Sequence, residues 1–103
     1  MPHEILDVCT VFGVWPKRQA DIALPTLLAQ MRTYGIARAC TLSAAGILYD
    51  FVEGNTETLA AARAHPELIP VGTVNVCRWL GCLDEARRLI DAGVRLFRFF
   101  PQY

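Results

Sequence analysis

Apolar residues follow two alternating patterns along this chain. Short apolar runs, typical of buried strands, alternate with segments whose apolar residues fall three or four positions apart, as on one face of a helix. Bounded by these patterns, the predicted strands are 4–9, 38–43, 68–76 and 94–100, and the predicted helices are 25–34, 55–65 and 83–92. The chain therefore alternates strand and helix from end to end.

Local start and stop signals support the helices. Pro25 suits a first helical turn, where its missing N–H is not needed, and Gly35 suits the position just past a helix end. Asn55 is a plausible N-cap for the second helix, which is expected to stop before Pro66. The stretch 44–54 before it is predicted to be a loop.

The order β-α-β-α-β-α-β predicts an α/β fold. Corresponding strand positions at Val8, Leu42, Val74 and Phe99 are 34, 32 and 25 residues apart, the length of a strand–helix unit with its loop. Such units give a parallel sheet with right-handed crossovers, either a doubly wound sheet or a (β/α)₈ barrel. No glycine-rich dinucleotide fingerprint follows Cys9. Both architectures bind ligands at the carboxyl ends of the strands.

Composition narrows the class of protein. The 103 residues, 53% hydrophobic and with zero net charge, predict one folded domain, 1–103, with nucleic acid not the main partner. No apolar run is long enough for a membrane span, and the first residues lack a signal-peptide pattern, so a cytoplasmic location is expected. The charged cluster 84–88 is expected on a solvated helix face. Because a small domain leaves much of its surface in contact with water, so high an apolar fraction predicts that this chain buries extra surface against another chain or is part of a larger protein.

Four cysteines are present, and they form no C-x-x-C pair: Cys9, Cys40, Cys77 and Cys82. Small buried hydrophobic residues with free thiols are the favoured interpretation, because nothing indicates an oxidising compartment. A metal role for Cys9 is the alternative.

The residues 6–13, LDVCTVFG, resemble the first-strand motif of metal-dependent hydrolases of the amidohydrolase superfamily, in which an aspartate precedes a His-x-His pair. In the same order, residues 34–39 resemble that family's turn into strand two, and 54–70 resemble its second helix and third strand. Residues 92–97, followed by Pro101, resemble its fourth strand. The family fold is a (β/α)₈ TIM barrel of about 250 residues. The resemblance therefore implies that this chain corresponds to the N-terminal half of such a barrel, without the later strands that bring further metal-binding histidines and the catalytic aspartate.

The family also implies a divalent, zinc-like metal, but its two histidine positions map onto Cys9 and Val11. Valine cannot ligate a metal, and a lone thiolate is a poor site, so Cys9 is a degenerate metal position. No cofactor, no tightly bound metal and no catalytic residue are predicted for this chain. Asp7 is either an orienter of a metal ligand or a buried structural carboxylate. His3 and His65 are expected at a solvated terminus and a helix end.

Three residues at predicted strand ends are candidates for substrate binding. Arg98 can pair with an anionic group if it points into the barrel, and Ser43 and Asn75 can offer hydrogen bonds at its mouth. Ordinary strand-end polar residues and a structural ion pair are the alternatives. Trp15 and Trp79, in loops after strands one and three, are expected to pack beneath those loops.

Three functions stay open. The first is the N-terminal half of a hydrolase that hydrolyses or decarboxylates a small substrate, inactive as this chain alone. The second is a non-catalytic half-barrel with a decayed metal site that pairs with itself or with a complementary half-barrel. The third is a small doubly wound domain that binds a small ligand. In a half-barrel the outer edges of strands one and four and the inward face are uncovered, which predicts self-association or docking on a partner.

Overall fold

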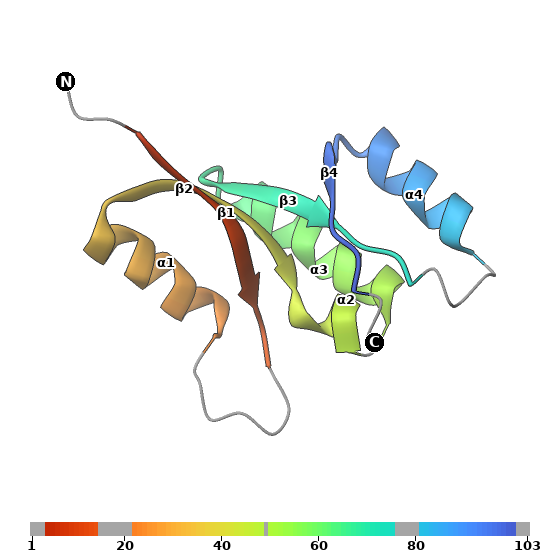
Figure 1. Ribbon diagram of the computed structural model, residues 1–103, viewed down its shortest axis with the longest axis horizontal. Helices are drawn as coiled ribbons and strands as arrows, with labels where there is room; N and C mark the ends of the chain where they lie inside the picture. The colour runs from red at the N-terminus through yellow and green to blue at the C-terminus, as the bar shows by residue number, and fades with distance from the viewer. Residues whose placement is uncertain (1–3, 15–21, 49, 76–80, 101–103) are drawn as a thin grey trace.

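The computed structural model describes residues 4–14, 22–48, 50–75 and 81–100 (Figure 1). Its strands are β1 (Ile5–Phe12), β2 (Ile36–Ser43), β3 (Leu68–Gly72) and β4 (Leu96–Phe97). They form one curled sheet in the order β1-β2-β3-β4, and every neighbouring pair is parallel. The predicted parallel sheet with sequential strand order is therefore confirmed.

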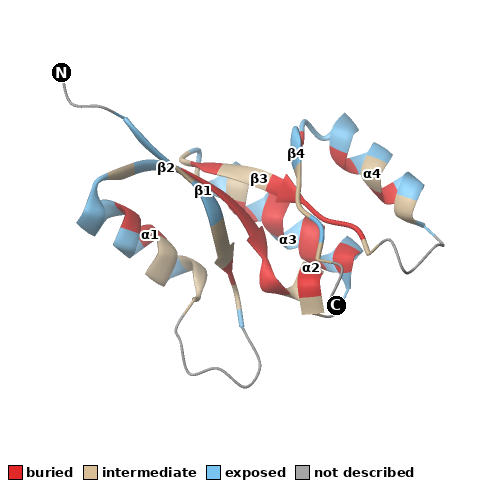
Figure 2. Cartoon of the chain, in the orientation of Figure 1, coloured by how far each residue is buried: buried red, intermediate tan, exposed pale blue. Residues whose placement is uncertain are grey.

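Three helices cover one face of this sheet: α1 (Leu24–Tyr34), α3 (Phe51–Ala64) and α4 (Cys82–Asp91). On that face Ala39 of β2 and Leu68 of β3 pack with Leu28 of α1 and Ala61 of α3. The opposite face carries Cys40, Leu42 and Val71 and stays largely free of helices (Figures 1 and 2). Helices on a single face are the arrangement of a barrel wall rather than of a doubly wound sheet. None of the helices in the described part of the chain is long and apolar enough to cross a bilayer.

The signals for the first helix are confirmed. Pro25 occupies the first turn of α1, and Gly35 follows its end with φ of 67°, a left-handed conformation that glycine adopts without steric cost. The Gly35 N–H donates to the carbonyl of Arg32.

The predicted loop 44–54 is wrong. A short helix, α2 (Ala44–Leu48), follows β2 directly, and α3 begins at Phe51 rather than after Asn55. The true cap is Asp50, whose Oδ1 accepts hydrogen bonds from the N–H groups of Val52 at 2.8 Å and Glu53 at 3.4 Å. Both Asp and Asn are good N-caps, so local sequence allowed either start. Asn55 instead lies inside α3, fully buried.

The outer strands also differ from the pattern. β4 contains two residues instead of the seven predicted, and β1 extends three residues further than predicted. The register runs Asp7 with Ala39 and then Thr10 with Thr41, so β1 holds one extra residue there, a β-bulge at 8–9. The bulge shifts which side chains reach each face, and a period-two pattern does not predict it.

Helices α2 and α3 cross at two glycines. A Cβ on Gly54 would collide with the backbone of Gly46, so the helices touch there without side chains between them. This close contact anchors α2 at the carboxyl end of β2, where the candidate ligand residues gather.

The change Gly54→Ala is expected to destabilise the fold by roughly 3 kcal/mol, because a backbone neighbour cannot move aside as a side chain can. Urea unfolding followed by circular dichroism measures the loss. Gly35→Ala is the matched control: no atom lies within 4 Å of its added Cβ, and the expected cost is about 1 kcal/mol from its left-handed backbone. Equal costs for the two changes would contradict the close crossing.

Candidate functional site

The helix-free face of the sheet encloses a hollow of about 290 Å³. All four strands and the residue that follows β4 line it, with Val8, Thr10, Cys40, Leu42, Val71, Leu96, Phe97 and Arg98. Figure 2 shows this face beside exposed stretches of β1 and β4. The hollow is mostly apolar, as the interior face of a closed barrel is.

Arg98 is the one charged side chain among the described residues that line the hollow. Its backbone N–H donates to the Gly72 carbonyl at 2.9 Å, which extends the β3–β4 pairing by one residue. Its guanidinium carbon lies 4.8 Å from the centre of the Phe100 ring, a cation–π contact that holds the charge at the carboxyl end of β4. Of the three candidate binding residues, Arg98 is the one on this face.

Cys40 lies on the same face and is 3% exposed. Burial raises the pKa of its thiol, while the positive charge of Arg38 opposes that shift and the negative charge of Asp7 adds to it. The Cys40 carbonyl accepts a hydrogen bond from the Thr10 hydroxyl at 2.8 Å. The thiol is therefore protonated at neutral pH and behaves as an apolar lining group.

Ser43 is buried and lies outside the hollow. Its hydroxyl donates to Glu57 Oε2 at 2.7 Å and accepts from the Ala45 N–H at 3.2 Å, while its own N–H donates to the Thr58 hydroxyl at 2.9 Å. These bonds cap α2 and join β2 to α3. The side chain is thus engaged in structure at the strand end, and a role in binding substrate stays a prediction.

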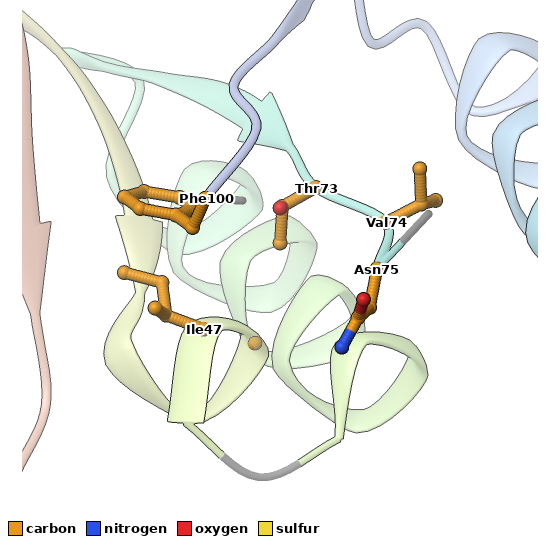
Figure 3. A pocket seen from close by; sticks show the side chains of 6 residues that line it. Ile47, Thr73, Val74, Asn75 and Phe100 are labelled. Atoms are coloured by element: carbon orange, nitrogen blue, oxygen red, sulfur yellow. The ribbon is translucent and has the colours of Figure 1, made fainter. Parts of the chain in front are cut away.

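Asn75 borders a separate, small cavity at the carboxyl end of β3. The cavity has room for about one water molecule, 10 Å³, and its lining is Gly46, Ile47, Thr73, Val74, Asn75 and Phe100 (Figure 3). The Asn75 carbonyl accepts from the Cys82 thiol at 3.0 Å. Phe100 borders this cavity and also stacks under Arg98, so it lies between two of the predicted binding residues.

The residues at the family's first metal positions do not fit a divalent metal. The Cys9 side chain is exposed, and Val11 packs against the apolar cluster of Cys40 and Leu42. Asp7 Oδ1 accepts from the Cys9 N–H at 3.0 Å, so its carboxylate supports the bulged backbone, not a thiolate ligand. Among the described residues no group of three or more His, Cys, Asp or Glu side chains converges.

The remaining predicted residues add little to this site. His65 Nδ1 lies 3.7 Å from Glu67 Oε1, next to the end of α3 as expected. His3, Trp15, Cys77 and Trp79 lie outside the described residues.

A buried polar network joins α3, the end of β3 and α4. Asn55 is 1% exposed; its Nδ2 donates to the Thr73 carbonyl at 2.7 Å and to Glu85 Oε2 at 2.8 Å. Its Oδ1 accepts from the Thr73 N–H at 3.0 Å. Glu85 also receives two hydrogen bonds from Arg88, from Nε at 2.6 Å and from Nη2 at 2.9 Å. Every polar atom of the Asn55 amide is therefore used.

The expectation that 84–88 forms a solvated face is wrong for Glu85. That carboxylate is 4% exposed, whereas Asp84 and Arg87 are exposed as expected. A buried carboxylate requires a partner, and the Arg88 guanidinium is the partner of Glu85. Their hydrogen bonds raise the pKa of Arg88 above its usual value. The available signal was spacing: Glu85 precedes the buried Leu89 by four residues and so shares its face.

Comparisons with known proteins do not assign the chain to a family. No protein-family model, no curated protein and no solved structure matches it.

Replacement of Asn55 by alanine is expected to cost about 2–4 kcal/mol of folding free energy, because it removes three hydrogen bonds and leaves buried polar partners unpaired. Chemical denaturation measures the change. Asp84→Asn, on the exposed side of α4, is the control and is expected to stay within about 0.5 kcal/mol. A loss below about 1 kcal/mol for Asn55→Ala would show that the network does not hold α4.

Cys40 is expected to react slowly with iodoacetamide until the pH rises above 9.0, the usual pKa of a cysteine thiol. The chain with Cys9, Cys77 and Cys82 changed to serine leaves one thiol to follow by mass spectrometry. Because the folded pKa is raised, the stabilisation from the neutral thiol is present below pH 9.0 and is lost above it. The same chain in urea is the control. An equal pH profile in both states would contradict the burial effect.

Proposed function

We propose that this chain is one half of a (β/α)₈ barrel of the amidohydrolase type, and that its own part in the function is to bind the carboxylate of a small substrate. The observation that carries the proposal is the position of Arg98. It places a guanidinium at the carboxyl end of β4, on an apolar concave face. In parallel α/β folds, ligands bind at that end of the strands.

The chemistry of this surface favours an amphipathic acid. A guanidinium pairs with a carboxylate through two parallel hydrogen bonds, and Phe100 holds the Arg98 side chain in place beforehand. The neighbouring side chains Leu96 and Phe97 present an apolar surface to the rest of the ligand. A small organic carboxylate therefore matches the site better than a free inorganic anion does.

The proposal assigns no catalytic step to this chain alone. At the two positions that the resemblance maps onto metal ligands, Cys9 is exposed and Val11 packs in the apolar cluster, so no reaction is routed through a metal here. Hydrolysis or decarboxylation belongs to the completed barrel under this proposal. The alternative, a purely assembling half-barrel, is distinguished by whether the Arg98 end of the sheet binds a ligand at all.

Titration of the ¹⁵N-labelled full chain with benzoate tests carboxylate binding. Saturable NMR shifts are expected for the Arg98 Nε–H signal and for the backbone amides at the end of β4. Arg98→Gln is expected to weaken benzoate binding at least about tenfold. The change removes a charge-assisted hydrogen bond, which contributes about 1.5–3 kcal/mol to the binding free energy.

Arg95→Gln is the matched control, since Arg95 is an exposed arginine three residues earlier and outside the lining of the hollow. Its benzoate affinity is expected to equal that of the unchanged chain. Circular dichroism verifies the fold of both variants. Absence of shifts, or an equal loss in both variants, would favour the purely assembling half-barrel.

A further inference from the structure

The described part of the chain leaves many apolar side chains uncovered. Ten of its large hydrophobic side chains are at least 45% exposed. Exposed apolar side chains that lie together mark an interaction surface, whereas single ones are ordinary on a protein surface.

Five of the ten large exposed apolar side chains among the described residues lie at the two outer strands of the sheet. In β1, Ile5, Leu6 and Val8 are 49%, 48% and 70% exposed, and at β4, Leu96 and Phe99 are 47% and 54% exposed. Within the described residues, β1 pairs only with β2 and β4 only with β3. Two strand edges with unpaired backbone groups therefore adjoin the open hollow.

The two edges carry opposite charges. The charged residues of 4–12 are both acidic, Glu4 and Asp7, and those of 94–100 are both basic, Arg95 and Arg98. An edge of this kind repels a copy of itself and attracts the other edge. Pairing of β1 with β1, or of β4 with β4, is thereby disfavoured.

We propose that a second copy of this chain closes the barrel, with β4 of each copy alongside β1 of the other. A two-fold axis parallel to the barrel axis keeps all eight strands parallel and pairs both open edges in one assembly. The two hollows then face each other and form the interior. This inference rests on the half-barrel part of the proposed function and supplies the partner that completes its site.

The closed barrel fixes which residues meet at the seam. Leu96 pairs with Val71, and Leu42 pairs with Val11. The β2–β3 register, which pairs Thr41 with Pro70, brings these two pairs level when it is continued by one residue. An eight-stranded barrel of this type has a shear of about eight residues, so each half contributes about four. Four residues towards the start of β2 lies Arg38, whose partner on β1 is Leu6. A shift in the other direction would run past Phe12, the end of β1.

Leu96 of one copy is therefore placed opposite Leu6 of the other. Both side chains are about half exposed in the single chain, and Leu96 borders the hollow. The two seams are equivalent, so each seam contains one such pair and each copy contributes Leu96 to one pair and Leu6 to the other. In the dimer each of these leucines covers the other, which accounts for their exposure in the single chain.

Light scattering coupled to gel filtration tests the assembly with the full chain. A dimer of twice 11.5 kDa, about 23 kDa, is expected, and Leu96→Lys is expected to weaken its association at least tenfold. Leu83→Lys is the control: this leucine on α4 is 72% exposed and lies away from the seam, so the dimer should persist. A monomer, or an assembly that Leu96→Lys leaves intact, would overturn the proposal.

Cross-linking tests the register, in a background with Cys9, Cys77 and Cys82 changed to serine. Oxidation of the double variant Leu6→Cys, Leu96→Cys is expected to give a disulfide-linked dimer on a non-reducing gel. The control pair Leu6→Cys, Phe99→Cys is displaced by three residues, about 10 Å, beyond the reach of a disulfide. Preferential linking of the control pair would refute this seam. A dimer that passes both tests without binding benzoate would retain the barrel closure and refute the carboxylate function.

Discussion

A parallel sheet carries apolar side chains on both faces, and it is stable in water only where both faces are covered. In this chain α1, α3 and α4 cover one face, and the other is left as an open hollow lined by Val8, Leu42 and Leu96. This one-sided cover determines the rest of the molecule. It explains the half-exposed leucines at both strand edges and the apolar concave wall on which the charged Arg98 lies.

The position of that arginine depends on contacts far from it. Asn55 binds the Thr73 backbone and Glu85, and so holds α4 against α3. Leu89 of α4 then lies close over Gly72, where a Cβ would meet both Leu89 and the ring of Phe97. The absence of a side chain at that glycine lets β4 and α4 approach β3. β4 is only two residues long, so its alignment relies on this support and on the Arg98 N–H bond to Gly72.

Hydrophobic periodicity and the helix start and stop signals were sufficient to predict the order of the strands and helices, but not all of their bounds. Pro25, Gly35 and the apolar runs correctly gave α1 and the parallel sheet, because these signals depend on local backbone preferences. The start of α3 was missed because Asp50 and Asn55 are equally good caps, and only tertiary contacts show that Asn55 is needed inside. Similarly, the spacing from Leu89 indicates the face on which Glu85 lies, but it does not predict the partner of the buried carboxylate, because the Asn55 amide is 30 residues away.

The candidate site divides in the same way. Alternation along the fourth strand places Arg98 on the face opposite Phe97 and Phe99, but it leaves open which of the two faces is concave. The structure places Arg98 in the lining of the hollow. The position of Ser43 could not be anticipated, because its partners Glu57 and Thr58 lie on a helix that packs from the other side. The bulge in β1 likewise has no period-two signature, although it exposes Cys9 and engages the Asp7 carboxylate with the backbone.

These placements determine what kind of charge the concave face of the sheet offers to a ligand. On β1, Val11 makes apolar contacts with the cluster of Cys40 and Leu42. A fixed guanidinium at the end of β4 provides positive charge from the opposite edge of the same sheet. Such a charge attracts a carboxylate but cannot activate water as a metal ion does. A concave face with Arg98 as its cationic group is thus suited to hold an acid in place rather than to activate water against it.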